Sequence, residues 1–218
     1  MKTLIKIVLL LIPFYGVGQP NTTGIGQRNT TGISHSNIVD NYYNEICHYT
    51  EFSGKLNEPF KFKEDVYIYV VGDNKPDYLM KELYTVVDEL NALIKSIEIY
   101  ITNDRNKENA LLYFGDPDQY VKYMDKPYRR KFLKSNWGAA WITPHSYNED
   151  EIGSVDIFVN VKESTEIFAR HLIREELTQS LGFPNDSYEY ENSIFYGSWS
   201  DVTEFSDLDK QLIRKHYN

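Results

Sequence analysis

Apolar residues recur along this chain with two periods, and these periods predict alternating strands and helices. Five segments of five to eight residues alternate in polarity or are continuously apolar, which is typical of strands. They are residues 66–71, 97–101, 110–114, 136–142 and 154–161. Between the first two, apolar residues recur at helical spacing from Pro76 to Ser96, at Leu79, Leu83, Val86, Val87, Leu90, Leu93 and Ile94. We therefore expect a long amphipathic helix over this stretch, packed on a sheet.

Three further helices are predicted after the third strand. A short one is expected within 118–128, and a long one from about Ser164 to Leu181, where Gly182 suits the C-terminal cap. The last spans 207–217 and can be N-capped by Thr203 or Ser206. Two long helices on one side of a five-stranded mixed sheet, with a C-terminal helix, predict an α+β fold.

The first residues have the pattern of a secretory signal. Lys2 and Lys6 precede a short apolar run, and Gly16 and Gly18 are small residues placed for cleavage near Gly18. We expect residues 1–18 to be a signal peptide and the protein to be secreted, periplasmic or on the cell surface. An uncleaved membrane anchor is the alternative.

Residues 19–36 are predicted to be a disordered linker. They are polar and Gly-rich, and the sequence Asn-Thr-Thr-Gly-Ile occurs twice in them. Asn21 and Asn29 lie in glycosylation sequons, which matter only in a host that glycosylates exported proteins. The folded domain is expected at 37–218.

Charge and cysteine content argue against two further features, nucleic-acid binding and an intramolecular disulfide. The net charge of −9 on 218 residues, with one short basic cluster at Arg129-Arg130-Lys131, argues against nucleic-acid binding. The single cysteine, Cys47, excludes an intramolecular disulfide and is expected to be a small semi-buried residue. A catalytic thiol or an inhibitory thiol in the Cys47-His48 pair is the alternative.

The predicted helix 164–181 contains one physical anomaly. On a helical wheel, Glu176 falls inside the apolar stripe formed by Ala169, Ile173 and Leu177. A carboxylate there must be paired, protonated or bound to a metal. The alternative is a solvated acidic face that drifts slightly out of period. His171 lies four residues before Glu175, and an ion pair between the two side chains explains it. A metal-binding pair of the form H-x-x-x-E is the alternative.

Residues 175–186 resemble the metzincin helix and turn, H-E-x-x-H-x-x-G-x-x-H-D. Residues 193–198 resemble the turn beneath the metzincin metal, with Phe195 in place of methionine, and residues 205–217 resemble the terminal helix. The pattern Glu-Glu-x-x-Gln-x-Leu-Gly-x-x-Asn-Asp is also similar to that of a bacterial family of secreted proteins classed as a domain of unknown function.

The resemblance implies a zincin-like fold and a role for each matched residue. Glu176 takes the position of the general base, and the metal positions fall on Glu175, Gln179 and Asn185 or Asp186. These ligands offer only oxygen, so Ca²⁺, Mg²⁺ or Mn²⁺ is favoured over Zn²⁺. Recruitment of His145 as a further ligand is an alternative.

Three functions remain open from the sequence. The first is a metal-dependent peptidase acting on an extended peptide or protein. The second is a binding protein or cell-surface protein of the same fold without metal. The third is a structural surface protein with an acidic helix, in which the side chains of Gln179 and Asn185 pack away from each other.

Overall fold

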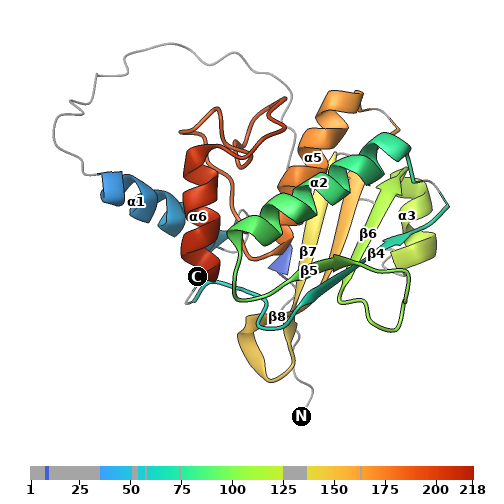
Figure 1. Ribbon diagram of the computed structural model, residues 1–218, viewed down its shortest axis with the longest axis horizontal. Helices are drawn as coiled ribbons and strands as arrows, with labels where there is room; N and C mark the ends of the chain where they lie inside the picture. Colours follow the sequence, from blue (N-terminus) through green and yellow to red (C-terminus); the bar gives the residue numbers. More distant parts are fainter. Residues whose placement is uncertain are drawn as a thin grey trace.

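A computed structural model describes residues 8–9, 35–50, 54–56, 58–73, 75–124, 137–162 and 164–218 of the 218-residue chain. Helices and a central sheet make up a mixed α/β fold (Figure 1). No helix in these ranges combines the length and apolar character needed to cross a membrane.

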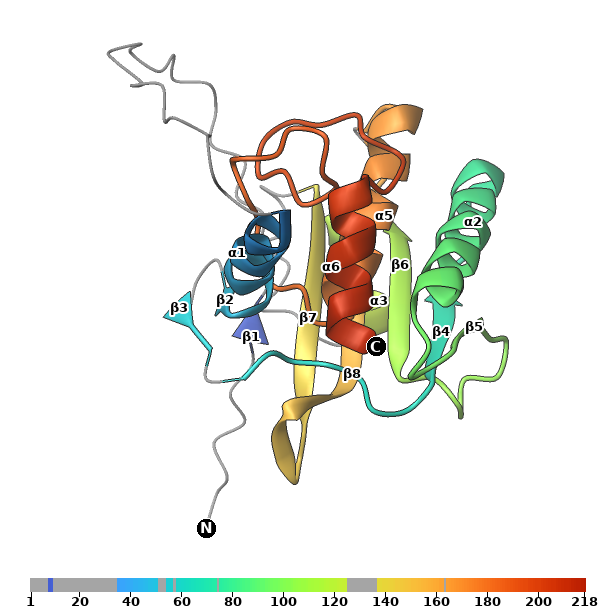
Figure 2. The ribbon, with the colours of Figure 1, turned by 60° about the vertical axis from the view of Figure 1, so that its left-hand side comes forward.

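The central sheet is mostly parallel. Its order is β1 (Val8–Leu9), β7 (Gly138–His145), β8 (Asn148–Asn160), β6 (Ala110–Gly115), β4 (Val66–Val71) and β5 (Ile99–Ile101). Strands β8, β6, β4 and β5 are parallel, whereas β7 pairs antiparallel with β8. Figure 2 shows β7 at one side of the sheet, with the two-residue β1 beside it. A separate ribbon joins β2 (Tyr49–Thr50) to β3 (Gly54–Lys55).

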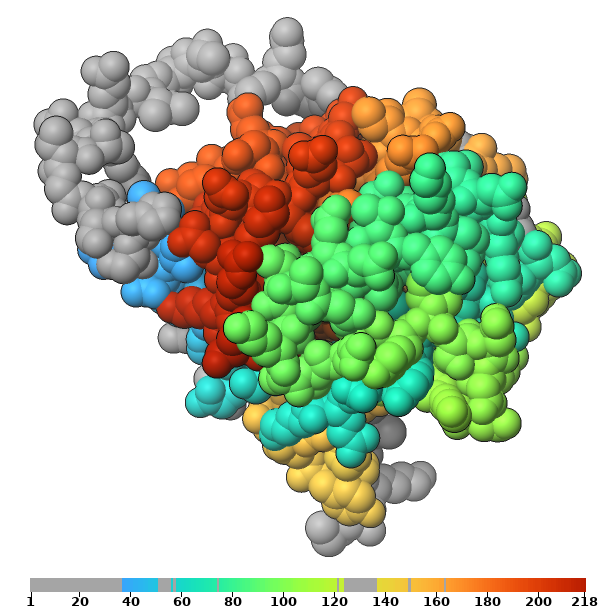
Figure 3. Space-filling view, viewed as in Figure 1, coloured from blue at the N-terminus to red at the C-terminus, as the bar shows by residue number. Residues whose placement is uncertain are grey.

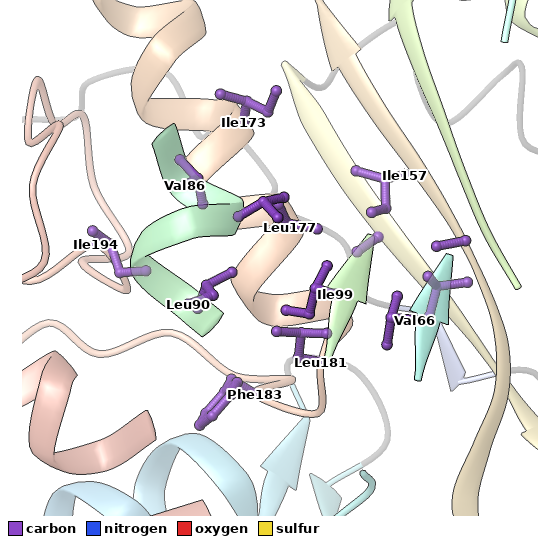
Figure 4. Close-up of a cluster of buried hydrophobic side chains, with 14 of the residues drawn as sticks. Val66, Val86, Leu90, Ile99, Ile157, Ile173, Leu177, Leu181, Phe183 and Ile194 are labelled. Carbon is purple, nitrogen blue, oxygen red and sulfur yellow. The ribbon is translucent and has the colours of Figure 1, made fainter. Parts of the chain in front are cut away.

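Two long helices, α2 (Asp77–Leu93) and α5 (Glu166–Ser180), cover one face of the sheet, as the sequence predicts (Figure 1). Pro76 precedes the first turn of α2, where a missing N–H costs nothing. Alternate strand residues meet the helices in one apolar core (Figure 4). That core includes Val66, Val86, Leu90, Ile99, Ile157, Ile173, Leu177, Leu181, Phe183 and Ile194. Its continuity fixes the position of α5 against β7 and β8.

The opposite face of the sheet carries a smaller aromatic cluster. Helix α3 (Pro117–Met124) places Tyr120 against Phe158 and Trp141, with ring centroids 5.4 and 5.7 Å apart. Because successive side chains of a strand point to opposite faces, the sheet contributes side chains to both apolar clusters.

The C-terminal part of the chain packs across the end of α5. Helix α6 (Asp207–Tyr217) is N-capped by Ser206 in a capping box with Asp209, so Ser206 and not Thr203 is the cap. The segment leading into α6 and α6 itself lie beside α2 on the surface (Figure 3). The Tyr217 hydroxyl donates to the Leu181 carbonyl at 2.6 Å, which joins the end of α6 to the end of α5.

Gly182 ends α5 with φ +108°, confirming the predicted glycine at this turn. A Cβ at this position would overlap the carbonyl oxygen of Phe60 and lie 3.0 Å from Nε2 of His216. Both the backbone conformation and the close approach therefore require glycine.

Several elements differ from expectation: β1 and the β2–β3 ribbon were not predicted, and β1 makes the described sheet six-stranded where five strands were expected. Strand β8 begins at Asn148, six residues before its predicted start, because its polar first residues form a hairpin with the end of β7. Helix α1 (His35–Cys47) was not predicted, although Ile38, Tyr42 and Ile46 recur every four residues in it. It begins two residues inside the predicted linker 19–36. The rest of that linker, and all of the predicted signal peptide except β1, lie outside the described residues.

Candidate functional site

Helix α5 is enclosed on all sides over its second half. The Thr165 hydroxyl caps its start by accepting from the Phe168 N–H. From His171 to Ser180 every residue is buried. The alternative of a solvated acidic face is therefore wrong: Glu175, Glu176 and Gln179 are all buried, because α5 lies between the sheet, α2 and the segment that precedes α6.

His171 and Glu175 form a buried pair one turn apart. His171 Nε2 lies 3.3 Å from Glu175 Oε2, and Nδ1–H donates to the Val202 carbonyl at 2.7 Å. Burial lowers the pKa of His171, but the Glu175 carboxylate and the Val202 carbonyl raise it, and the net pKa is above its ordinary value. The predicted ion pair is confirmed, and it occupies one oxygen of a candidate metal ligand.

The other candidate ligands form hydrogen bonds with one another and with α1. The Gln179 amide donates to Asp186 Oδ1 at 2.7 Å, so these two side chains meet. The Asn185 amide donates instead to the Glu45 carbonyl on α1 at 3.0 Å. The Asn185 amide also donates to the backbone carbonyl of Asp186 at 3.0 Å, so Asp186 accepts from both Gln179 and Asn185.

This arrangement does not fit a divalent cation. Ca²⁺, Mg²⁺ and Mn²⁺ need several oxygens directed at one point. Here Glu175 faces a histidine N–H, while Asp186 and the Glu45 carbonyl accept from amide N–H groups. Within the described ranges, no three His, Cys, Asp or Glu side chains gather closely enough to hold a metal.

Glu176 lies where the helical wheel places it, facing the sheet. It is fully buried, and its carboxylate rests against Gly138 at the start of β7. A Cβ on Gly138 would come within 2.9 Å of the Glu176 Cδ and overlap Oε1. The absence of a side chain at 138 therefore creates the room that this carboxylate fills, and Gly138 marks a close approach between β7 and α5.

The side of β7 that faces away from β8 pairs with an extended segment. The Trp137 carbonyl accepts from the Asn160 N–H at 2.7 Å, so odd-numbered residues of β7 bond to β8. Antiparallel alternation directs the backbone groups of Gly138, Ala140 and Ile142 away from β8. Strand β1 pairs there, with Val8 opposite Ile142 and Leu9 opposite Trp141.

The turn after α5 is held by a buried hydrogen-bond network that sequence reasoning missed. Ser193 donates to Asp209 Oδ1 at 2.6 Å and accepts from the Tyr42 hydroxyl at 2.5 Å and the Phe195 N–H at 3.0 Å. Asp209 Oδ2 accepts from the Ser206 N–H at 2.9 Å. Burial raises the pKa values of Asp209 and Tyr42. The network joins α1, the turn and α6, and the capping pattern Ser-x-x-Asp was its only signal in the sequence.

Arg174 was also missed. It is 1% exposed and donates to Glu82 on α2 at 2.9 Å and to Glu89, and its guanidinium lies 4.7 Å from the centre of the Phe205 ring. The two glutamates are seven residues apart, which places them on one face of α2 and was a usable signal.

Two alternatives raised by the sequence receive no support here. Cys47 is fully buried, and burial raises the pKa of its thiol well above the ordinary value, so the reactive thiolate is disfavoured. His145 is exposed at the end of β7 and hydrogen-bonds with the Tyr147 N–H, outside the α5 site.

Comparison with known proteins gives one family and a distant structural likeness. No curated protein sequence matches the chain. Among solved structures, one titled "Structure of Myroilysin" is similar with a TM-score of 0.42 and 9% identity, covering 73% of this chain and 82% of that one. Another, titled "Crystal structure of myroilysin", has a TM-score of 0.42 and 10% identity over 78% and 88%. A family described as "Protein of unknown function (DUF2927)" matches residues 36–218. Since this match covers most of the chain, the protein belongs to that family.

Proposed function

We propose that this protein is an exported peptide-binding protein with a zincin-like fold, and that it holds an extended segment along the outer edge of β7 without a metal. The observation that carries the proposal is the pairing of Val8 and Leu9 with this edge. This apolar segment belongs to the predicted signal peptide, so its removal from the exported protein would leave the edge open to another extended segment, which is how β-augmentation works.

The polar residues of α5 and of the turn after it favour peptide binding over metal-dependent chemistry. Glu175, Gln179 and Asn185 are each held by a neighbouring group, namely His171, Asp186 and the Glu45 carbonyl. Opening all three contacts would leave buried polar groups without partners, at a cost of about 1–3 kcal/mol each. The candidate ligands therefore serve as hydrogen-bonded supports that hold α5, the turn after it and α1 together.

Selection of random nine-residue peptides displayed on phage against the purified exported protein tests the proposal. Each enriched peptide is then synthesised in two N-methylated forms, with methyl groups on one or the other alternate set of amides. We expect one form to lose binding by at least about tenfold and the other to bind like the parent, because only alternate amides face the edge strand. Failure to enrich any sequence, or equal loss in both forms, would refute binding along the edge.

Elemental analysis of the untagged protein, purified without chelators, tests the proposal that no metal is bound. We expect less than one metal ion in ten molecules. A stoichiometric divalent ion would overturn the metal-free proposal.

Hydrolysis of the bound peptide is the competing function, and one observation favours it. The Glu176 carboxylate lies against Gly138, on the strand along which the peptide would run. Incubation of the enriched peptides with the wild-type protein and with Glu176→Gln, followed by mass spectrometry, separates the two functions. Cleavage by the wild type that Glu176→Gln abolishes would establish hydrolysis; intact peptides in both reactions support binding alone.

A further inference from the structure

Three aromatic side chains meet where β7 and α5 both begin. The Trp199 ring stacks on Phe168 with centroids 3.9 Å apart and planes inclined by 18°. The Trp137 ring is inclined by 76° to Phe168 and by 89° to Trp199, with its centroid 5.6 Å and 6.5 Å from theirs. Phe168 in turn stacks on His171 at 6.0 Å. We call Trp137, Phe168 and Trp199 the aromatic platform.

The platform is partly open at its surface. Phe168 is buried and Trp137 half-buried, but Trp199 is 47% exposed. An indole ring that shields a phenylalanine and still presents half of its surface to solvent offers a large rigid area for a further apolar group.

The platform lies at one end of the proposed peptide site. Trp137 immediately precedes Gly138, and its carbonyl bonds to Asn160 at the end of β8. Helix α5 begins six residues after Asn160, which brings Phe168 to the same end of the sheet. A strand running along β7 toward Gly138 therefore arrives at the aromatic platform.

The direction of that strand follows from the register of β1. Leu9 lies opposite Trp141, and Val8 lies opposite Ile142. Continuing this antiparallel register, the third residue after the one opposite Trp141 lies opposite Gly138. Directly opposite residues point to the same face, and Gly138 faces α5 because Glu176 rests on it. The residue of a bound strand that lies opposite Gly138, near the C-terminal end of that strand, thus directs its side chain to the face of the sheet that carries α5 and the aromatic platform.

From this geometry we infer that the aromatic platform selects the ligand: the extended peptide carries an aromatic or large aliphatic residue near its C-terminal end, which packs on Trp199 and Trp137. The inference rests on the proposed peptide-binding function. Burial of such a side chain together with ring packing is worth at least about 1.4 kcal/mol, or a tenfold change in affinity.

Peptide selection with three variants tests the inference. Trp199→Ala removes the exposed ring, Trp199→Phe keeps an aromatic surface, and Tyr147→Ala is the matched control because Tyr147 is 93% exposed at the tip of the β7–β8 hairpin. The probe is the peptide enriched on the wild type, together with a version in which its C-terminal apolar residue is alanine. Fluorescence anisotropy gives the affinity of the wild type and of each variant for each of the two peptides.

We expect the enriched peptides to share an apolar residue at one C-terminal position. Trp199→Ala should weaken the parent peptide at least tenfold and leave the alanine version unchanged, while Trp199→Phe and Tyr147→Ala should bind both like the wild type. Peptides without a shared apolar position, or equal weakening of both versions by Trp199→Ala, would overturn the platform's role and leave edge binding intact. Absence of any enriched peptide would instead refute the proposed function itself.

Discussion

His216 on α6 should make this protein lose stability in mild acid. It is 4% exposed, with Nε2–H donating to the Phe60 carbonyl at 2.8 Å and Nδ1 lying 3.2 Å from the Tyr43 hydroxyl. Burial, with a smaller contribution from Lys61 and His48, lowers the pKa of His216 from 6.5 to about 4 despite the opposing bond to Phe60. The folded protein therefore keeps this ring neutral at pH values at which the unfolded chain protonates it.

The size and sign of the effect follow from that difference. Between pH 6.5 and pH 4 the unfolded chain binds more protons at His216, so the free energy of unfolding falls as the pH falls. The loss relative to pH 7.5 is about 2 kcal/mol at pH 5 and about 3 kcal/mol at pH 4. It is complete only below the folded pKa of about 4.

Chemical denaturation at pH 7.5, 5 and 4 measures this loss, and His216→Gln is the comparison. The glutamine amide can still donate to the Phe60 carbonyl but does not titrate. Whatever the substitution costs through packing, the variant should lose about 3 kcal/mol less than the wild type between pH 7.5 and pH 4. His171, Asp209 and other titrating groups are present in both proteins and cancel. Equal losses in the two proteins would refute the assignment of a lowered pKa to His216.

Three other substitutions test the packing around α5. Gly182→Ala should cost about 3 kcal/mol in chemical denaturation, because alanine is strained at φ +108° and its Cβ meets the Phe60 carbonyl; an unchanged midpoint would contradict this geometry. Arg174→Ala leaves Glu82 in a largely buried position and should cost about 3 kcal/mol, seen as a fall of about 6–12 °C in Tm, whereas Arg174→Met should cost clearly less. Ser193→Ala removes the hydroxyl that donates to Asp209 and should cost about 1–3 kcal/mol in denaturation at neutral pH.

The elements with strong local periodicity could be predicted from the sequence. Strand β4, helix α2 and helix α6 agree with expectation to within about three residues, because their apolar residues repeat over the full length of each element. Helix α1 was missed because its few apolar residues lie next to a polar, Gly-rich stretch and its stability depends on distant contacts. One of these is the bond from Tyr42 to Ser193, 151 residues away.

The candidate site was predictable only in part, for a related reason. A helical wheel shows how side chains are arranged around one helix, so it could place Glu176 toward the sheet. It could not show that Val202 would cover His171, or that Asn185 would turn to the Glu45 carbonyl. Those contacts depend on the path of the chain after Gly182, which has no periodicity to reveal it.

The enclosure of α5 has a consequence for the order in which the protein opens. Its amides between His171 and Ser180 are covered by three layers of structure. The ion pair of Arg174 with Glu82 links α5 to α2, and the hydrogen bond from His171 to the Val202 carbonyl links it to the segment around Val202. Water can reach these amides only when several elements separate together, so they should exchange with deuterium at the rate of global unfolding. The amide hydrogens of α5 would then be the last to exchange, and those on the outer edge of β7 would be among the first.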